Sequence, residues 1–143
     1  MTVGYSGTPV PKKLGLKAPM RLVILDAPTE YEMIVGPLPE GIKLSTVLSE
    51  NVDLVHIFAS SRATLSAHLV NLRHQLKDNV VVWVSWPKKA SKVATDITED
   101  TIRELALPLG YVDIKVCAVS EIWSGLKLVV RKALRDGAKP GAS

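Results

Sequence analysis

Three continuous apolar segments of strand length constrain the fold of this chain most strongly. They are MRLVILDAP at 20–28, VDLVHIFAS at 52–60 and VVVWVSW at 80–86. Unbroken apolar runs of this length are typical of strands buried on both faces of a parallel sheet. After the second run, leucines recur at intervals of three and four residues and predict an amphipathic helix over 62–77; they are Leu65, Leu69, Leu72 and Leu76.

The C-terminal third predicts one more helix and a closing hairpin. Asp96 and Glu99 have the spacing of a capping box, and the helix they would begin ends at Gly110. Two further strands follow, at 111–120 and 126–132, with only about half a dozen residues between them. A connection this short cannot form a parallel crossover, so these two strands must pair antiparallel.

The N-terminal segments complete the pattern. Thr8 is placed to cap a short helix that starts at Pro9 and stops at Gly15, and Thr29 is placed to cap a second short helix. The segment 42–48 can add a short strand. The sequence therefore predicts a three-layer, doubly wound α/β domain whose sheet is mostly parallel with an antiparallel C-terminal hairpin strand. We expect a single domain over 1–135 and a flexible tail over 136–143.

Composition excludes several classes of protein. The chain has 143 residues, 47% of them apolar and 22% charged, which is ordinary for one globular domain. The N-terminus lacks the features of a secretory signal, and no apolar run reaches the ~20 residues that cross a bilayer. Cys117 is the only cysteine, so an internal disulfide or a cysteine-based zinc site is excluded and a reducing cytoplasm is expected.

The histidines do not predict a metal site. His68 and His74 stand six apart on one predicted helix, which is not a metal-ligand spacing on one face, and His56 is interpreted as a satisfied core residue in mid-strand. No metal and no cofactor is assigned, and the oligomeric state is left open.

A candidate site follows from the predicted sheet, because ligands bind outside the carboxyl ends of parallel strands near the point where strand order reverses. Lysines at a strand exit, an Arg that can clasp an anion and the N-terminus of the 62–77 helix favour a small anionic ligand, such as a nucleotide or a phosphorylated metabolite. Tryptophans can supply a flat wall for a ring. The candidate residues are Tyr5, Ser6, Thr8, Asp26, Ser60, Ser61, Arg62, Trp86, Lys88, Lys89 and Trp123.

Structural explanations compete with this hypothesis. Lysines after a strand commonly form a solvated loop, and tryptophans in a small domain commonly cap its core. Asp26 can serve as a helix cap in place of Thr29.

The order of segments resembles a trimmed class I S-adenosylmethionine-dependent methyltransferase, shorter by roughly one strand and one helix. The strings GYSGTP, PKKLG, LVILDAP, WVSWPKKAS and VCAVSEIWSGLKLV also resemble an uncharacterised bacterial family, domain of unknown function 3052, over about 4–131. That second resemblance implies no activity. The first implies a glycine-rich exit from the first strand, whereas this chain reads Asp26-Ala27-Pro28-Thr29 with no glycine before Gly36, and Glu50 is the nearest acid for a ribose.

Three functions remain open. The favoured hypothesis is a methyltransferase-like domain without catalysis, or of unknown activity, that binds a small anionic ligand or a protein partner. The second is an enzyme, a degenerate methyltransferase included, in which Lys88, Lys89 and Arg62 hold a phosphate and Asp26 moves a proton. The third, less favoured, is a nucleic-acid binder that contacts phosphates without reading bases, through the lysine loop and the basic tail.

Overall fold

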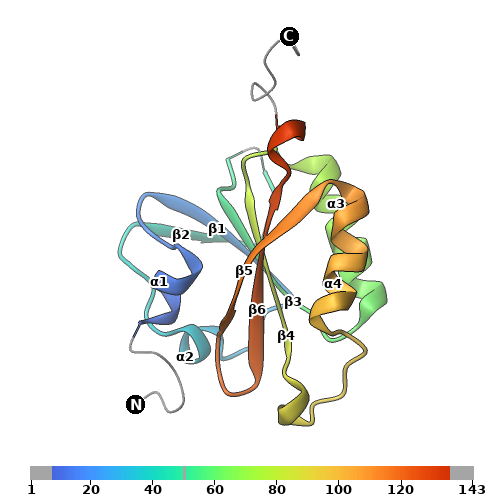
Figure 1. Ribbon diagram of the computed structural model, residues 1–143. Helices are drawn as coiled ribbons and strands as arrows, with labels where there is room; N and C mark the ends of the chain where they lie inside the picture. Colours follow the sequence, from blue (N-terminus) through green and yellow to red (C-terminus); the bar gives the residue numbers. More distant parts are fainter. Residues whose placement is uncertain (1–7, 50, 136–143) are drawn as a thin grey trace.

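The computed structural model describes residues 8–49 and 51–135, and these form a six-stranded sheet flanked by helices (Figure 1). The predictions for Tyr5, Ser6, Glu50 and the tail 136–143 lie outside the described residues. The sheet has the order β2-β1-β3-β4-β6-β5. Its strands are β1 (Met20–Leu25), β2 (Ile42–Ser45), β3 (Leu54–Phe58), β4 (Val81–Pro87), β5 (Tyr111–Ala118) and β6 (Trp123–Val130).

The directions of the strands confirm the predicted topology. Strands β1 to β4 pair in parallel, and β6 runs antiparallel to both of its neighbours, β4 and β5. The short connection 119–122 therefore closes an antiparallel hairpin, as its length requires. The short strand expected within 42–48 is present as β2.

Helices cover both faces of the sheet, which confirms the three layers (Figure 1). Helices α3 (Arg62–Gln75) and α4 (Glu99–Ala106) lie on one face, where the leucines of α3 pack against β3, β4 and β6. The shorter helices α1 (Val10–Leu14) and α2 (Tyr31–Val35) lie on the other face. Three single-turn helices complete the elements, namely η1 (Lys89–Ser91), η2 (Leu107–Leu109) and η3 (Lys132–Leu134).

Helix starts differ from the sequence predictions. Pro9, not Thr8, is the N-cap of α1, and no side chain caps that helix. Glu30, rather than Thr29 or Asp26, is the N-cap of α2, because the Thr29 hydroxyl donates to the Glu30 carboxylate instead. Short polar side chains have several local acceptors and donors within reach, so the sequence alone does not select among them.

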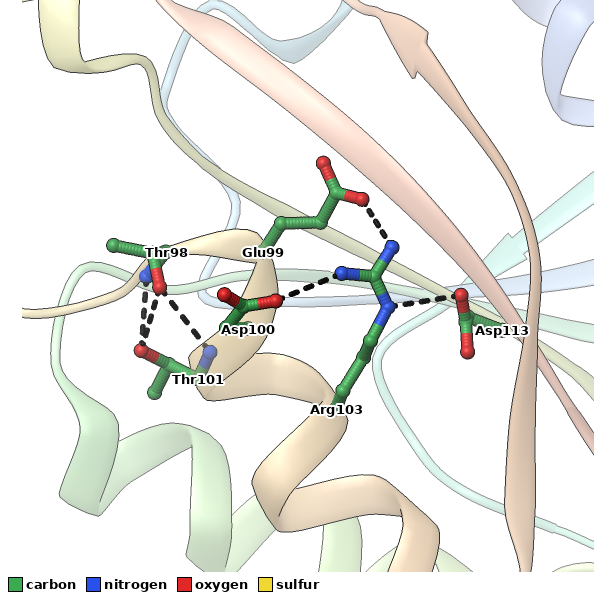
Figure 2. Close-up of polar contacts among 6 residues, drawn as sticks. All are labelled: Thr98, Glu99, Asp100, Thr101, Arg103 and Asp113. Atoms are coloured by element: carbon green, nitrogen blue, oxygen red, sulfur yellow. Dashed lines mark hydrogen bonds and ion pairs between the residues drawn. The ribbon is translucent and has the colours of Figure 1, made fainter.

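The capping box of α4 also lies two residues beyond its predicted position. Thr98 is the N-cap; its hydroxyl accepts the Thr101 N–H, and the Thr101 hydroxyl accepts the Thr98 N–H (Figure 2). Asp96 contacts another helix: its carboxylate accepts the backbone N–H of Arg62 at 2.6 Å. Gly15 and Gly110 do end their helices in the left-handed conformation, with φ of 81° and 102°, as predicted.

Arg103 ties α4 to strand β5 (Figure 2). Its guanidinium donates to Asp113 of β5 and to Asp100 of its own helix, each at 3.0 Å, and also to Glu99. The hydrogen bond from Arg103 holds the pKa of Asp113 below its ordinary value. A carboxylate near the start of the edge strand is thus already paired within the fold.

His56 lies at the centre of the sheet and has both ring nitrogens hydrogen-bonded. It is 0% exposed; Nδ1 lies 3.0 Å from the Tyr31 hydroxyl, and Nε2 lies 2.7 Å from Ser85 Oγ. Phe58 stacks on the imidazole with 4.4 Å between ring centroids. Burial lowers the pKa of His56 to about 3 and raises that of Tyr31. The geometry agrees with the interpretation of His56 as a satisfied core residue.

The buried imidazole predicts a defined loss of stability in acid. In the unfolded chain a histidine gains its proton near pH 6.5, whereas His56 in the fold stays neutral down to about pH 3. The stability that the neutral His56 contributes is therefore complete above pH 6.5 and is lost as the pH falls toward 3, by about 2–3 kcal/mol between pH 7 and pH 4.5. Urea unfolding across this range should show that His56→Gln has a flatter pH dependence than the wild type. The exposed His74→Gln is the control, and an unchanged slope in His56→Gln would refute the assignment.

Gly125 of β6 leaves room for the largest side chain of the core. Trp83 of β4 is 0% exposed, and its indole N–H donates to the Leu14 carbonyl of α1 at 2.9 Å. A Cβ at Gly125 would stand 3.3 Å from the Trp83 ring and 3.0 Å from a Val119 methyl. The indole cannot shift without losing its hydrogen bond, so the close approach of β6 requires glycine here.

We therefore expect Gly125→Ala to destabilise the fold by about 1–2 kcal/mol, because it overpacks a well-filled core. The cost should shrink in a Val119→Ala background, where the tightest contact is removed, and a double-mutant cycle on the free energy of unfolding measures this coupling. Independent, additive effects of the two substitutions would show that the contact does not limit the residue at 125.

Candidate functional site

A crevice opens at the carboxyl ends of β1 and β3. From β1 the chain passes to α2 on one face of the sheet, and from β3 it passes to α3 on the opposite face (Figure 1). Segments that leave neighbouring strands in opposite directions leave a gap between them, which is where open α/β sheets bind ligands. The gap has a volume of about 380 Å³ and is lined by Asp26, Pro28, Phe58, Ala59, Ser60, Ser61, Thr64 and Trp123.

Phe58 and Trp123 form an aromatic wall in the crevice. Their rings meet edge to face, with centroids 5.0 Å apart. Phe58 also stacks on the buried His56, and Trp123 pairs with Pro87 across β4 and β6. Because core contacts hold both rings, the wall is formed before any ligand arrives.

Hydroxyl groups line the side of the crevice toward α3. Ser61, one of the two serines before the helix, is the N-cap of α3, and its Oγ accepts the N–H of Thr64 at 3.4 Å. A hydroxyl that accepts in this way keeps its hydrogen for another acceptor. The carbonyl of Ser60 is bound by the Thr95 hydroxyl at 2.8 Å, which anchors the loop after β3.

Asp26 and His68 are hydrogen-bonded to each other beside the crevice. Asp26 directly follows β1 in the left-handed conformation, with φ of 57°, which aspartate tolerates better than most residues. Its Oδ2 lies 2.7 Å from His68 Nε2, and the two side chains are 54% and 24% exposed. Sequence reasoning missed His68 as a site residue. The sequence feature that could have indicated it is its position on the predicted helix over 62–77, one helical turn after Thr64.

Several candidate residues lie away from the crevice lining. Arg62 turns to Glu104, with 2.8 Å between guanidinium nitrogen and carboxylate oxygen, and Asp96 accepts its backbone N–H. The N-terminus of α3, predicted to attract an external anion, is thus partly complemented by a carboxylate of the chain itself. Trp86 is 7% exposed and packs in the core under α3 and α4, so it is no ring wall.

The lysine loop and Thr8 are also outside the lining. Lys88 is half-buried, and its backbone N–H donates to the Ile122 carbonyl at 2.7 Å; Lys89 is exposed at the start of η1. Both follow the carboxyl end of β4, at the edge where the crevice opens. Thr8 lines a different pocket, between α1 and α2. The crevice thus unites Asp26, Ser60, Ser61 and Trp123, a smaller set than the sequence predicted.

Comparison with known proteins places the chain in a family. The model of the family described as "Protein of unknown function (DUF3052)" matches residues 44–132. The chain belongs to this family. No curated protein matches it.

Solved structures share the fold at low sequence identity. A SAM dependent methyltransferase from Aquifex aeolicus has a TM-score of 0.62 at 13% identity, with 85% of this chain and 87% of that chain covered. Aeropyrum pernix fibrillarin, solved with natively bound S-adenosyl-L-methionine, has a TM-score of 0.55 at 13% identity over 80% and 68% of the two chains. A protein in the NADB-Rossmann superfamily from Streptococcus agalactiae has a TM-score of 0.53 at 13% identity over 91% and 70%. The DUF3052 chain therefore has a Rossmann-like, methyltransferase-type fold.

The described residues do not fit S-adenosylmethionine in the way this fold implies. The exit of β1 carries side chains at Asp26, Ala27, Pro28 and Thr29, so a cofactor cannot approach the backbone as it would over glycines. After β2 the described chain continues as Thr46 to Ser49 without an acid to accept ribose hydroxyls, and Glu50, the nearest acid, lies outside the described residues. We therefore derive no methyl transfer from the fold.

Two further absences hold within the part of the chain that the structure describes. No three His, Cys, Asp or Glu side chains there are grouped to hold a metal ion. No helix there is long and apolar enough to cross a membrane.

The carboxylate of Asp96 at the start of α3 is a testable element of the site's scaffold. Asp96→Ala removes the acceptor of the Arg62 N–H and should lower the free energy of unfolding by about 1 kcal/mol, as loss of a helix cap does. Hydrogen exchange at the first amides of α3 should quicken. Glu121→Ala, on the exposed hairpin turn, is the matched control. Equal stability of Asp96→Ala and the control would mean that the contact contributes nothing.

Proposed function

We propose that this domain binds one small ligand, with a flat ring and an anionic group, in the crevice between the ends of β1 and β3. The observation that carries the proposal is the lining itself. It sets the preformed wall of Phe58 and Trp123 opposite the hydroxyls of Ser60, Ser61 and Thr64. A crevice of about 380 Å³ is within the size range of small-molecule sites.

The polar groups define how such a ligand would be oriented. The serine and threonine hydroxyls can donate to phosphate or carboxylate oxygens. The Asp26 carboxylate, partnered by His68 at 2.7 Å, is an acceptor for a hydroxyl or amino group of the ligand. The lysine loop at the end of β4 adds positive potential around the entrance, where it can attract an anion without touching it.

The arrangement supports binding rather than catalysis. An enzyme that used Asp26 for proton transfer would bury this side chain beside the cations that hold a phosphate. Asp26 is instead 54% exposed and is paired with His68, while Arg62 is engaged by Glu104. The methyltransferase resemblance implies a glycine-rich exit from the first strand, where the cofactor approaches the backbone. This chain has no glycine at that exit.

A thermal-shift screen tests this function. Nucleoside phosphates, sugar phosphates and S-adenosylmethionine are the probes, and a true ligand at 100 times its dissociation constant should stabilise the fold by about 2.7 kcal/mol. Trp123→Leu and the double variant Ser60→Ala, Thr64→Val should lose most of the response, each measured against its own ligand-free transition. The double variant Lys88→Ala, Lys89→Ala should weaken it at low salt only. Lys77→Ala, on an exposed lysine distant in sequence from these loops, is the control.

Three results would contradict the proposal. The first is a stabilisation retained in full by Trp123→Leu, which would place the ligand elsewhere. The second is a steep loss of affinity with salt together with a preference for long nucleic acids, which would indicate phosphate-backbone binding. The third is calorimetric binding of S-adenosylmethionine with methyl transfer, which would make the domain an enzyme.

A further inference from the structure

Strand β5 ends the sheet, and its second half forms an open edge. It is last in the strand order and pairs with β6 on one side only, so its outer backbone groups have no strand partner among the described residues. We call residues 114–118 the open edge. Two aliphatic side chains on it are half exposed, Ile114 at 52% and Val116 at 51%. An edge of this kind readily pairs with another extended chain.

Two lysines face each other next to this edge. Lys115 of β5 is directly opposite Lys127 of β6, and Lys127 is in turn opposite Trp83 of β4. Trp83 belongs to the core under α1, so both lysines lie on that face of the sheet. Helix α1 reaches the end of β5 on this face, where Lys13 Nζ donates to the Ala118 carbonyl at 3.3 Å. Farther along the hairpin, Lys115 is exposed and Lys127 is half-buried.

Neither lysine is neutralised within the described residues: the side chains of Lys115 and Lys127 make no hydrogen bond and no ion pair there. Like charges directly opposite each other on neighbouring strands destabilise a sheet. A lysine on an edge strand is a common protection against unwanted pairing, which accounts for Lys115. It does not account for Lys127, because β6 is an internal strand.

The acid on the same strand cannot neutralise them. Asp113 lies before the β-bulge between residues 113 and 115, and it pairs with Leu128, whose side chain is in the core under α3 and α4. Arg103 already binds it on that face (Figure 2). Lys115 and Lys127 therefore have no carboxylate partner among the described residues, and Ile114 and Val116 remain half exposed.

We propose that the open edge binds an extended peptide in which acidic and aliphatic residues alternate. Side chains of a strand point to opposite faces in turn. The acidic residues of such a peptide would lie on the face of Lys115 and Lys127, and its aliphatic residues would cover Val116, which shares its face with Leu126. Its backbone would supply the missing strand partner, as in other complexes formed by strand addition.

Other occupants fit less well. A second copy that paired through its own β5 would bring another Lys115 and Lys127, and the acid of that strand, Asp113, is already bound by Arg103, so like charge would meet like charge. A nucleic acid would meet the lysines but would leave the aliphatics and the open backbone groups unused.

The test uses a soluble peptide of alternating glutamate and valine, with a fluorophore for anisotropy. We expect saturable binding to the full chain, weakened about tenfold or more by Lys115→Ala combined with Lys127→Ala. Amide exchange should slow at 115–118 when the peptide is bound. Lys43→Ala, an exposed lysine on the opposite edge strand β2, is the matched control and should bind as the wild type does.

The proposal fails if a peptide of alternating lysine and valine, or one with its glutamates grouped together, binds equally well. It also fails if methylation of the peptide's backbone nitrogens has no effect, because strand pairing requires those donors. Protection of 115–118 that depends on protein concentration alone would assign the edge to a second copy. Equal competition by polyphosphate would assign the lysines to a polyanion.

Discussion

The burial of β3 and β4 on both faces is the constraint on which the rest of the structure depends. All five residues of β3 are buried, as are six of the seven in β4. Each such strand requires an apolar layer above and below it, which α3 and α4 provide on one face and α1 and α2 on the other. Polar side chains in these strands are buried where they hydrogen-bond to one another, as His56 does with Tyr31 and Ser85.

The two helical layers differ in extent, and their difference leaves the molecule's open surfaces. On the α3–α4 face, helices reach as far as β5, to which Arg103 ties α4. On the other face α1 is bound to Trp83 of β4 and, through Lys13, to the Ala118 carbonyl at the end of β5. The part of that face that carries Lys115 and Lys127 lies beyond these contacts and stays exposed or half-buried. The crevice has a different origin, because it follows from the opposite directions in which the chain leaves β1 and β3.

Much of this architecture could be predicted from local patterns. Continuous apolar runs specified the buried strands β3 and β4, and the leucine spacing specified α3, because such patterns record burial directly. The first run also forms a strand, β1, but only Leu22 and Val23 of its six residues are buried, so the prediction that it is buried on both faces was wrong. Caps were predicted less well: Thr8, Thr29 and Asp96 each have the right chemistry but other partners. Which of several nearby groups a short polar side chain binds depends on the tertiary structure.

The residues of the candidate site were likewise predictable only in part. Strand ends could be read from the sequence, so Asp26, Ser60, Ser61 and Trp123 were placed at a common edge. The directions of long side chains could not, because Arg62 is drawn to Glu104 on α4, 42 residues away in the sequence. Trp86 faces the core because it is the last apolar position of a strand buried on that side. His68 had no motif to mark it, since its partner Asp26 is also 42 residues distant.

The crevice belongs to the topology, whereas the chemistry within it belongs to the side chains. Any chain with this strand order leaves β1 and β3 in opposite directions and so has a gap at their ends, whether or not it holds a nucleotide cofactor. The structural similarity to methyltransferases, at 13% identity, explains the gap at the strand ends. It does not indicate which side chains line that gap. At the position where that fold uses glycine, this chain has Asp26 in a left-handed conformation, bound to a histidine of the helix opposite. The Asp26–His68 hydrogen bond bridges the two sides of the crevice, and in the proposed function a ligand would have to be accommodated around it. In the proposed function, selectivity would therefore depend on Asp26 and His68 together with Trp123, residues that the fold alone does not specify.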